Sequence, residues 1–134
     1  MPELPEVETV RRGLAGLILH RQITKVTGLC DKSLQIAPAD VSRLVTGATV
    51  TDVRRRAKML MIDLTGGYTL LIHLKMTGQL VYRGDQAWAA GHPNDSMIGE
   101  LPDKSTRVIF ELFGGGKLFF NDQRKFGWIK LYPT

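Results

Sequence analysis

The first residues of the sequence could bring an amine and a carboxylic acid together. If Met1 is removed, Pro2 becomes a free secondary amine, and an α-amino group has a reference pKa of about 7.7–8.0 against about 10.4 for lysine. Such an amine can attack an electrophilic carbon and form an iminium ion. Glu3 follows directly and Glu6 lies one helical turn further on, so a carboxylic acid could donate a proton beside the amine. With Met1 attached, the Pro2 nitrogen is a tertiary amide and cannot react.

The same segment also predicts an ordinary helix start. Apolar residues recur at spacings of three and four, which predicts an amphipathic helix over about 5–18. These residues are Val7, Val10, Leu14 and Leu17. Pro5 suits a first helical turn, and acids are favoured there by the helix dipole. The two interpretations are compatible, because the residues with reactive chemistry precede the helix.

A basic segment, "VRRRAKMLM", leads into a predicted strand. On a strand Arg54, Arg56 and Lys58 would share one face, because side chains alternate with a period of two. Such a row could follow a phosphate backbone. A solvated strand edge protected by charges is the alternative.

The segment "LLIHLKMTGQL" places His73 and Lys75 on the face opposite its apolar residues. His73 could donate to a phosphate, or it could be a solvated strand residue. Met76 shares the apolar face by periodicity, which favours core packing. Thr77 and Gly78 follow at once, however, and a loop tip there would expose Met76.

The segment "FFNDQRKFGW" places Arg124, Lys125 and Phe126 between two apolar strands. A cation and an aromatic ring on a turn can wedge into a base stack or stack on a base. An ordinary charged turn with a core phenylalanine is the alternative.

The remaining pattern predicts the fold class. Strands are expected in "RQITKVTGL" and, from Thr49 onward, in "TVTDVRR", "AKMLMIDL", "TLLIHLKMTGQLVY", "TRVIFELF", "KLFFND" and "GWIKLYP". "PADVSRLVTG" predicts a second, short helix, and residues 84–105 predict a long loop. We therefore expect an antiparallel two-layer β-sandwich of about 7–8 strands, flanked by an N-terminal helix and a second short helix.

Composition narrows the classes of function. The chain has 134 residues, 43% hydrophobic and 23% charged, as expected for one globular domain. Its formal net charge of +5 suits a polyanionic partner. Cys30 is the single cysteine, which excludes an internal disulfide and a cysteine-rich zinc site. No apolar run reaches the roughly 18–20 residues of a membrane span, and no signal peptide is visible, so a cytoplasmic protein is expected.

Four segments together resemble one family. "MPELPEVETVRRGL", "RRRAKMLMIDL", "LIHLKMTGQL" and "FFNDQRKFGW" occur in the order found in formamidopyrimidine-DNA glycosylases, which are bacterial DNA-repair enzymes. The resemblance covers residues 1–134 as the N-terminal catalytic domain of that family. It implies base-excision repair of damaged double-stranded DNA by a glycosylase that is also an AP lyase.

The resemblance also implies roles for the candidate residues. Pro2 would be the nucleophile at C1′ of a damaged deoxyribonucleotide such as 8-oxoguanine or a formamidopyrimidine, and the iminium would permit β- and δ-elimination. Glu3 would transfer protons, and Glu6 would support the lesion pocket. Lys58 and His73 would bind phosphate.

Three further residues match the group that fills the gap left by a flipped nucleotide, namely Met76, Arg124 and Phe126. Extrusion of a base costs a few kcal/mol, which explains the need for such residues. Lys125, a further DNA contact, stands where many members carry arginine, so it keeps the charge but loses the bidentate fork.

Family members continue into a helix–two-turn–helix module and a four-cysteine zinc finger, and this sequence contains neither. We therefore expect no cofactor, a monomer, and weak activity from these residues alone, because phosphate contacts are lost. A non-catalytic DNA-binding or accessory domain of the same fold is the alternative. A third interpretation is a basic β-sandwich that binds RNA or another polyanion.

Overall fold

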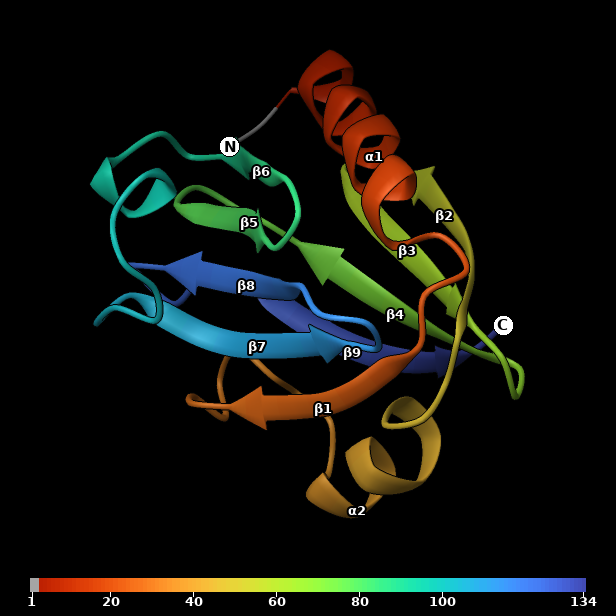
Figure 1. The fold of residues 1–134 in the computed structure, drawn as a ribbon. Coiled ribbons are helices and arrows are strands. Elements are labelled where there is room, and N and C mark those ends of the chain that lie inside the picture. The colour runs from red at the N-terminus through yellow and green to blue at the C-terminus, as the bar shows by residue number, and fades with distance from the viewer. Residues whose placement is uncertain (1–2) are drawn as a thin grey trace.

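The computed structural model of the chain describes residues 3–134, so the predicted nucleophile Pro2 lies outside the described residues. Two antiparallel β-sheets face each other, and a long helix, α1 (Leu4–Ile18), lies across one side of the pair (Figure 1). This helix contacts β2 and β3 of one sheet and β6 of the other. The helix therefore joins the two layers.

The larger sheet has five strands in the order β1-β7-β8-β5-β6. Their bounds are β1 (Ile23–Gly28), β7 (Thr106–Leu112), β8 (Lys117–Asp122), β5 (Gly78–Arg83) and β6 (Ala87–Gly91). The smaller sheet has four strands in the order β2-β3-β4-β9. Their bounds are β2 (Val50–Arg56), β3 (Met59–Leu64), β4 (Tyr68–His73) and β9 (Trp128–Pro133).

Short helical segments complete the described part of the chain. The second helix predicted from the sequence is α2 (Pro38–Asp40), which continues as a π-helical turn, η1 (Val41–Val45). A short 3₁₀ helix, η2 (Asp95–Met97), lies in the connection between β6 and β7. The predicted fold class, an antiparallel β-sandwich flanked by two helices, is confirmed.

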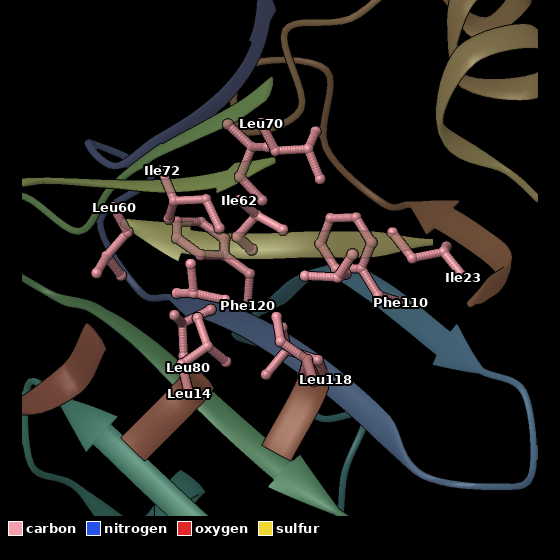
Figure 2. Close-up of a cluster of buried hydrophobic side chains, with 14 of the residues drawn as sticks. Leu14, Ile23, Leu60, Ile62, Leu70, Ile72, Leu80, Phe110, Leu118 and Phe120 are labelled. Carbon is pink, nitrogen blue, oxygen red and sulfur yellow. The ribbon is translucent and has the colours of Figure 1, made fainter. Parts of the chain in front are cut away.

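The core lies between the sheets and under α1. Side chains of both layers point into this space (Figure 2), where Leu60 and Ile72 of the smaller sheet and Phe120 of the larger sheet are fully buried. Leu14 of α1 is also fully buried and closes the core from the side. The helix follows the predicted period, except that Ile18 is buried in place of Leu17 as its last core residue.

Two predictions about the strands are wrong. Residues 84–105 are not all loop, because β6 pairs with β5 in register from Gln79↔Gly91 to Arg83↔Ala87. This edge strand is short and rich in alanine, so its pattern has little strand character. The segment "TLLIHLKMTGQLVY" is not one strand, because β4 ends at His73 and β5 begins at Gly78 in the other sheet. The break includes Lys75 at a φ of 53°, a conformation that sequence patterns rarely reveal in a residue other than glycine.

Two glycines of α1 provide a test of the contact between the helix and β6. A Cβ at Gly13 would lie 2.5 Å from Nε1 of Trp88, whereas a Cβ at Gly16 would meet nothing within 4 Å. We expect Gly13→Ala to lower the free energy of unfolding by about 1–3 kcal/mol, because the indole must move. Gly16→Ala is the matched control and should raise it by about 0.5–1 kcal/mol through helix propensity. Urea denaturation measures both, and equal effects of the two variants would contradict the close contact.

Candidate nucleic-acid interface

Two connections between the sheets run side by side at one end of the sandwich. Residues 74–77 lead from β4 to β5, and residues 123–127 lead back from β8 to β9. The strands that they join are hydrogen-bonded neighbours, with His73↔Trp128 in the smaller sheet and Gly78↔Asp122 in the larger one. The two connections are therefore neighbours at both of their ends. We call residues 74–77 the Met76 loop and residues 123–127 the Phe126 loop.

Met76 lies on the turn of its loop with 52% of its surface exposed. The prediction from periodicity that Met76 packs in the core is wrong. The strand has already ended at His73, and Lys75 in a left-handed conformation changes the direction of the chain. The loop-tip alternative is therefore the correct one. An exposed, flexible thioether side chain on a turn can enter a gap between stacked bases.

The Phe126 loop exposes Arg124, Lys125 and Phe126. Phe126 is 43% exposed, so it is not the core residue of the alternative interpretation. The guanidinium carbon of Arg124 lies 4.7 Å from the centre of its ring, and Nζ of Lys32 lies 5.8 Å from it. An aromatic face flanked by cations suits a base together with its phosphates.

Asp122 is a residue to which the sequence assigned no role. It is fully buried at the end of β8, and its carboxylate accepts hydrogen bonds from the Thr77 hydroxyl and from the Gly127 N–H, the latter at 2.7 Å. Its own carbonyl accepts from Nε of Arg107 at 2.9 Å. An acid that directly ends an apolar strand, with glycine five residues later, is the only local signal of this role.

His73 ends β4 with its ring half-buried, 5.7 Å from the ring of Trp128. Burial lowers the pKa of His73, and the positive charges of Lys75 and Lys58 lower it further. Nδ1 accepts the backbone N–H of Lys75 at 3.0 Å, so in the neutral ring the proton sits on Nε2. His73 therefore offers one neutral N–H donor to a ligand at physiological pH.

Glu3 occupies the position just before α1, and one of its carboxylate oxygens lies 3.8 Å from Nζ of Lys58. The glutamate side chain is 73% exposed and the lysine side chain 32%, so the pair is open to a ligand. Glu6 is exposed in the first turn of the same helix. The structure thus brings Glu3, the first described residue, and Lys58 together.

The predicted basic row on one strand face is wrong. Arg54 forms a bidentate pair with Asp63, with distances of 2.7 and 2.8 Å, so its guanidinium is committed within the protein. Lys58 lies in the turn between β2 and β3, where Ala57 has a φ of 51°. Strand alternation therefore does not extend to Lys58, and only Arg56 of the original row stays an exposed strand residue.

Glu8 organises a cluster that sequence reasoning missed. Its carboxylate accepts from Arg11 at 2.7 Å, Arg12 at 3.0 Å and Arg55 at 3.1 Å. The bonds from Arg11 and then Arg55 lower the pKa of Glu8 from its ordinary value of 4.5 to about 2. Since Arg55 belongs to β2, the cluster ties the helix to the smaller sheet. The spacing of Glu8 from the two helical arginines, three and four residues, is the signal that could have found it.

This cluster gives stability a specific dependence on pH. A lowered pKa in the folded state stabilises the protein above the ordinary pKa and loses that effect as the pH falls toward the folded value. We therefore expect Glu8→Gln to melt at a lower temperature than the parent at pH 7, with the difference shrinking below pH 4.5 and vanishing only below about pH 2. Thermal unfolding followed by circular dichroism measures this, with the exposed Glu100→Gln as the control. A difference that stays constant with pH would contradict the role of the charge.

The described residues show neither a metal-binding cluster nor a membrane-spanning helix. Across residues 3–134, no group of three or more His, Cys, Asp or Glu side chains is arranged to hold a metal ion. Within the same range, none of the helices has the length and apolar character needed to cross a membrane.

The register of the smaller sheet places Lys58 and its partner Glu3 at the same end of the sandwich as the Met76 and Phe126 loops. Leu60, which follows the turn with Lys58, pairs with Ile72 near the start of the Met76 loop. The fold and site define a two-sheet β-sandwich protein with a basic, partly aromatic surface at the end where the chain crosses between its sheets. The chain belongs to the formamidopyrimidine-DNA glycosylase family, since the family model of the N-terminal domain matches residues 1–129.

Individual relatives agree with this assignment. Formamidopyrimidine-DNA glycosylase of Cereibacter sphaeroides is 41% identical over 137 residues, covering 100% of this chain and 46% of that protein. The enzyme of the same name from Pelotomaculum thermopropionicum is 41% identical over 135 residues, covering 100% of this chain and 44% of that protein. The solved complex of Lactococcus lactis Fpg with DNA containing an abasic site has a TM-score of 0.82 at 26% identity, covering 99% of this chain and 44% of that one. The chain thus spans about half the length of the relatives it matches.

Proposed function

We propose that this chain is the catalytic, lesion-binding domain of a bifunctional DNA glycosylase and AP lyase that repairs oxidised purines in double-stranded DNA. The observation that carries the proposal is the gathering at one end of the sandwich of the Glu3–Lys58 pair, the His73 donor and the two exposed loops. Membership of the family and the solved Lactococcus lactis Fpg complex with abasic-site DNA support it.

The proposed chemistry begins at the amine that Pro2 presents once Met1 is removed. The amine forms a bond to C1′ of the damaged nucleotide as the bond from C1′ to the base breaks, and the base leaves with that electron pair and takes up the proton that the nitrogen loses. Glu3 then protonates the ring oxygen, the sugar opens, and an iminium ion joins Pro2 to C1′. The iminium acidifies C2′, so loss of a proton there expels the 3′ phosphate, and a second elimination expels the 5′ phosphate.

The remaining candidates would hold the DNA in place. Lys58 and Lys125 supply charge for phosphates, and His73 supplies the N–H of Nε2. We propose that Met76, Arg124 and Phe126 occupy the space that the flipped nucleotide leaves, and that Glu6 lies at the lesion pocket. Arg124 and Phe126 already contact each other and lie next to the loop of Met76.

The domain organisation and setting of the protein are part of the same proposal. The relatives are about twice as long, so we propose that in such proteins this domain forms one side of the DNA-binding cleft. A chain that holds only part of the phosphate contacts binds DNA more weakly, and its affinity depends less steeply on salt. Since these relatives come from bacteria, we propose a cytoplasmic monomer that acts on chromosomal DNA.

Reductive trapping tests the proposed chemistry. The protein is incubated at low salt with a duplex that contains an abasic site, borohydride is added, and the mass of the intact product is measured. The expected result is a covalent adduct that peptide mapping places on an N-terminal proline. Binding to the duplex without any adduct would contradict the enzymatic proposal and favour a non-catalytic DNA-binding domain. Equal binding to RNA duplexes and to damaged DNA would contradict the proposed substrate.

A further inference from the structure

The loops that carry the exposed residues are joined by a single buried hydroxyl. The Thr77 hydroxyl donates to one carboxylate oxygen of Asp122 and accepts the backbone N–H of Arg124 at 3.3 Å. The other carboxylate oxygen of Asp122 accepts the backbone N–H of Gly127 at 2.7 Å. These bonds hold the Phe126 loop at both ends and connect it to the Met76 loop.

We propose that Thr77 and Asp122 form a clasp that fixes the two loops relative to each other, so that their exposed side chains engage DNA as one unit. The inference rests on the proposed function of the loops and assigns Thr77 and Asp122 as positioning residues. Neither residue needs to touch DNA, because Asp122 is fully buried and Thr77 is 8% exposed.

Burial makes these hydrogen bonds difficult to replace. A buried carboxylate that loses a donor keeps the cost of its desolvation, whereas an exposed one regains water. The bonds to Asp122 are also assisted by its charge, which strengthens them relative to neutral pairs. The alternative loop arrangements that would separate Thr77 from Asp122 are therefore disfavoured.

Close backbone packing at two glycines supports these bonds. A Cβ at Gly127 would lie 2.7 Å from the carbonyl oxygen of His73 and 3.0 Å from the Asp122 carboxylate. A Cβ at Gly78 would likewise collide with the backbone of Leu74. The Gly127 contact packs the Phe126 loop against the end of β4, and the Gly78 contact closes the Met76 loop on itself, so both loops have little room to move.

A fixed arrangement has a consequence for binding. Ordering a side chain or loop at an interface costs free energy, and a loop that is already ordered avoids that cost. If the loops form one unit, Met76 and Phe126 contribute to binding together, and the effects of their removal are not independent. The clasp thus converts two short surface loops into one element.

The first test uses the protein without DNA. Thr77→Val keeps the shape of the side chain but removes the hydroxyl, and Thr77→Ser keeps the hydroxyl and is the matched control. We expect the amide protons of Arg124 and Gly127 to exchange with solvent at least about fivefold faster in Thr77→Val than in the parent, as measured by NMR. In Thr77→Ser their exchange rates should equal those of the parent. Unchanged exchange in Thr77→Val would overturn the clasp. Thermal unfolding establishes that both variants fold.

The second test measures the coupling between the loops. Met76→Ala, Phe126→Ala and the double variant are titrated with a duplex that contains a tetrahydrofuran abasic-site analogue. With Thr77 present, we expect the double variant to differ from the product of the single fold-changes by more than about threefold. With Thr77→Val, the difference should fall within about twofold, the range of independent sites. A coupling that is the same in both backgrounds would overturn the proposal that the clasp carries it.

The two tests separate this inference from the proposed function. A parent protein that binds the abasic duplex no better than undamaged DNA contradicts the proposed function. In that case, faster amide exchange in Thr77→Val still confirms the clasp, and unchanged exchange refutes it.

Discussion

A protein whose Pro2 nitrogen stays in a peptide bond is expected to form very little trapped adduct with abasic-site DNA. The lone pair of a tertiary amide is delocalised into the carbonyl group, and the nitrogen has no proton to lose. Lysine is a poor replacement on reference pKa values, because at pH 7.4 about one in a thousand free lysine amines is unprotonated, against roughly a quarter of free α-amino groups. We therefore expect a chain with an uncleaved N-terminal fusion to give at least about a hundredfold less adduct at equal time.

The same fusion protein, cleaved so that Pro2 becomes the first residue, is the control. Intact mass spectrometry after borohydride treatment measures the adduct in both, and a filter-binding titration shows whether the fusion blocks access to DNA. Equal trapping before and after cleavage would show that a lysine forms the bond. Peptide mapping would then identify that lysine, and the assignment of Pro2 would be abandoned.

Glu3→Gln is expected to slow adduct formation by about a hundredfold or more while leaving DNA binding within about twofold. Glutamine keeps the size of the side chain but cannot donate the proton that opens the sugar, and general acid catalysis is typically worth about 10²–10⁴ in rate. The helix start should tolerate the change, since Glu3 holds the Val7 N–H through its backbone carbonyl and its side chain makes no capping bond. The 3.8 Å contact with Lys58 is largely exposed and contributes little to stability.

Single-turnover trapping on a preformed abasic site measures this rate without requiring base excision. Glu100→Gln is the matched control, because Glu100 is also exposed and lies far along the chain in the connection before β7. If Glu3→Gln lowered binding as much as it lowered trapping, Glu3 would act in holding DNA. The role in proton transfer would then be wrong.

Local patterns were sufficient to predict most of the sandwich. The spacing of Val7, Val10 and Leu14 predicted the face of α1 that is buried, and the glycine-rich segment after Leu112 predicted the hairpin of β7 and β8. The sequence could not show that β4 and β5 belong to different sheets, because the apolar alternation continues across the Met76 loop. Which sheet a strand joins depends on pairing with distant strands, here β9 and β8.

In the candidate site, too, some features could be predicted from local sequence and others depend on distant partners. The residue types allowed either an exposed or a core Phe126 beside Arg124, and the geometry shows the exposed arrangement. The commitment of Arg54 to Asp63 and the burial of Asp122 between the loops did not follow, because each depends on a partner that folding supplies. Those partners lie 9 and 45 residues away along the sequence. Motifs identify the groups that can react, whereas the burial and pairing of those groups belong to the tertiary structure.

The paired crossings between the sheets link the proposed affinity for DNA to the stability of the whole domain. Each loop has one end in each sheet, so neither loop has its final shape until both sheets have docked. A core substitution between the layers, for example at Phe120 or Ile72, should therefore weaken binding in proportion to the unfolded fraction that it creates, although neither side chain can reach DNA. The proposed binding surface is therefore complete only in the fully folded domain, and we expect partly folded forms to bind damaged DNA poorly.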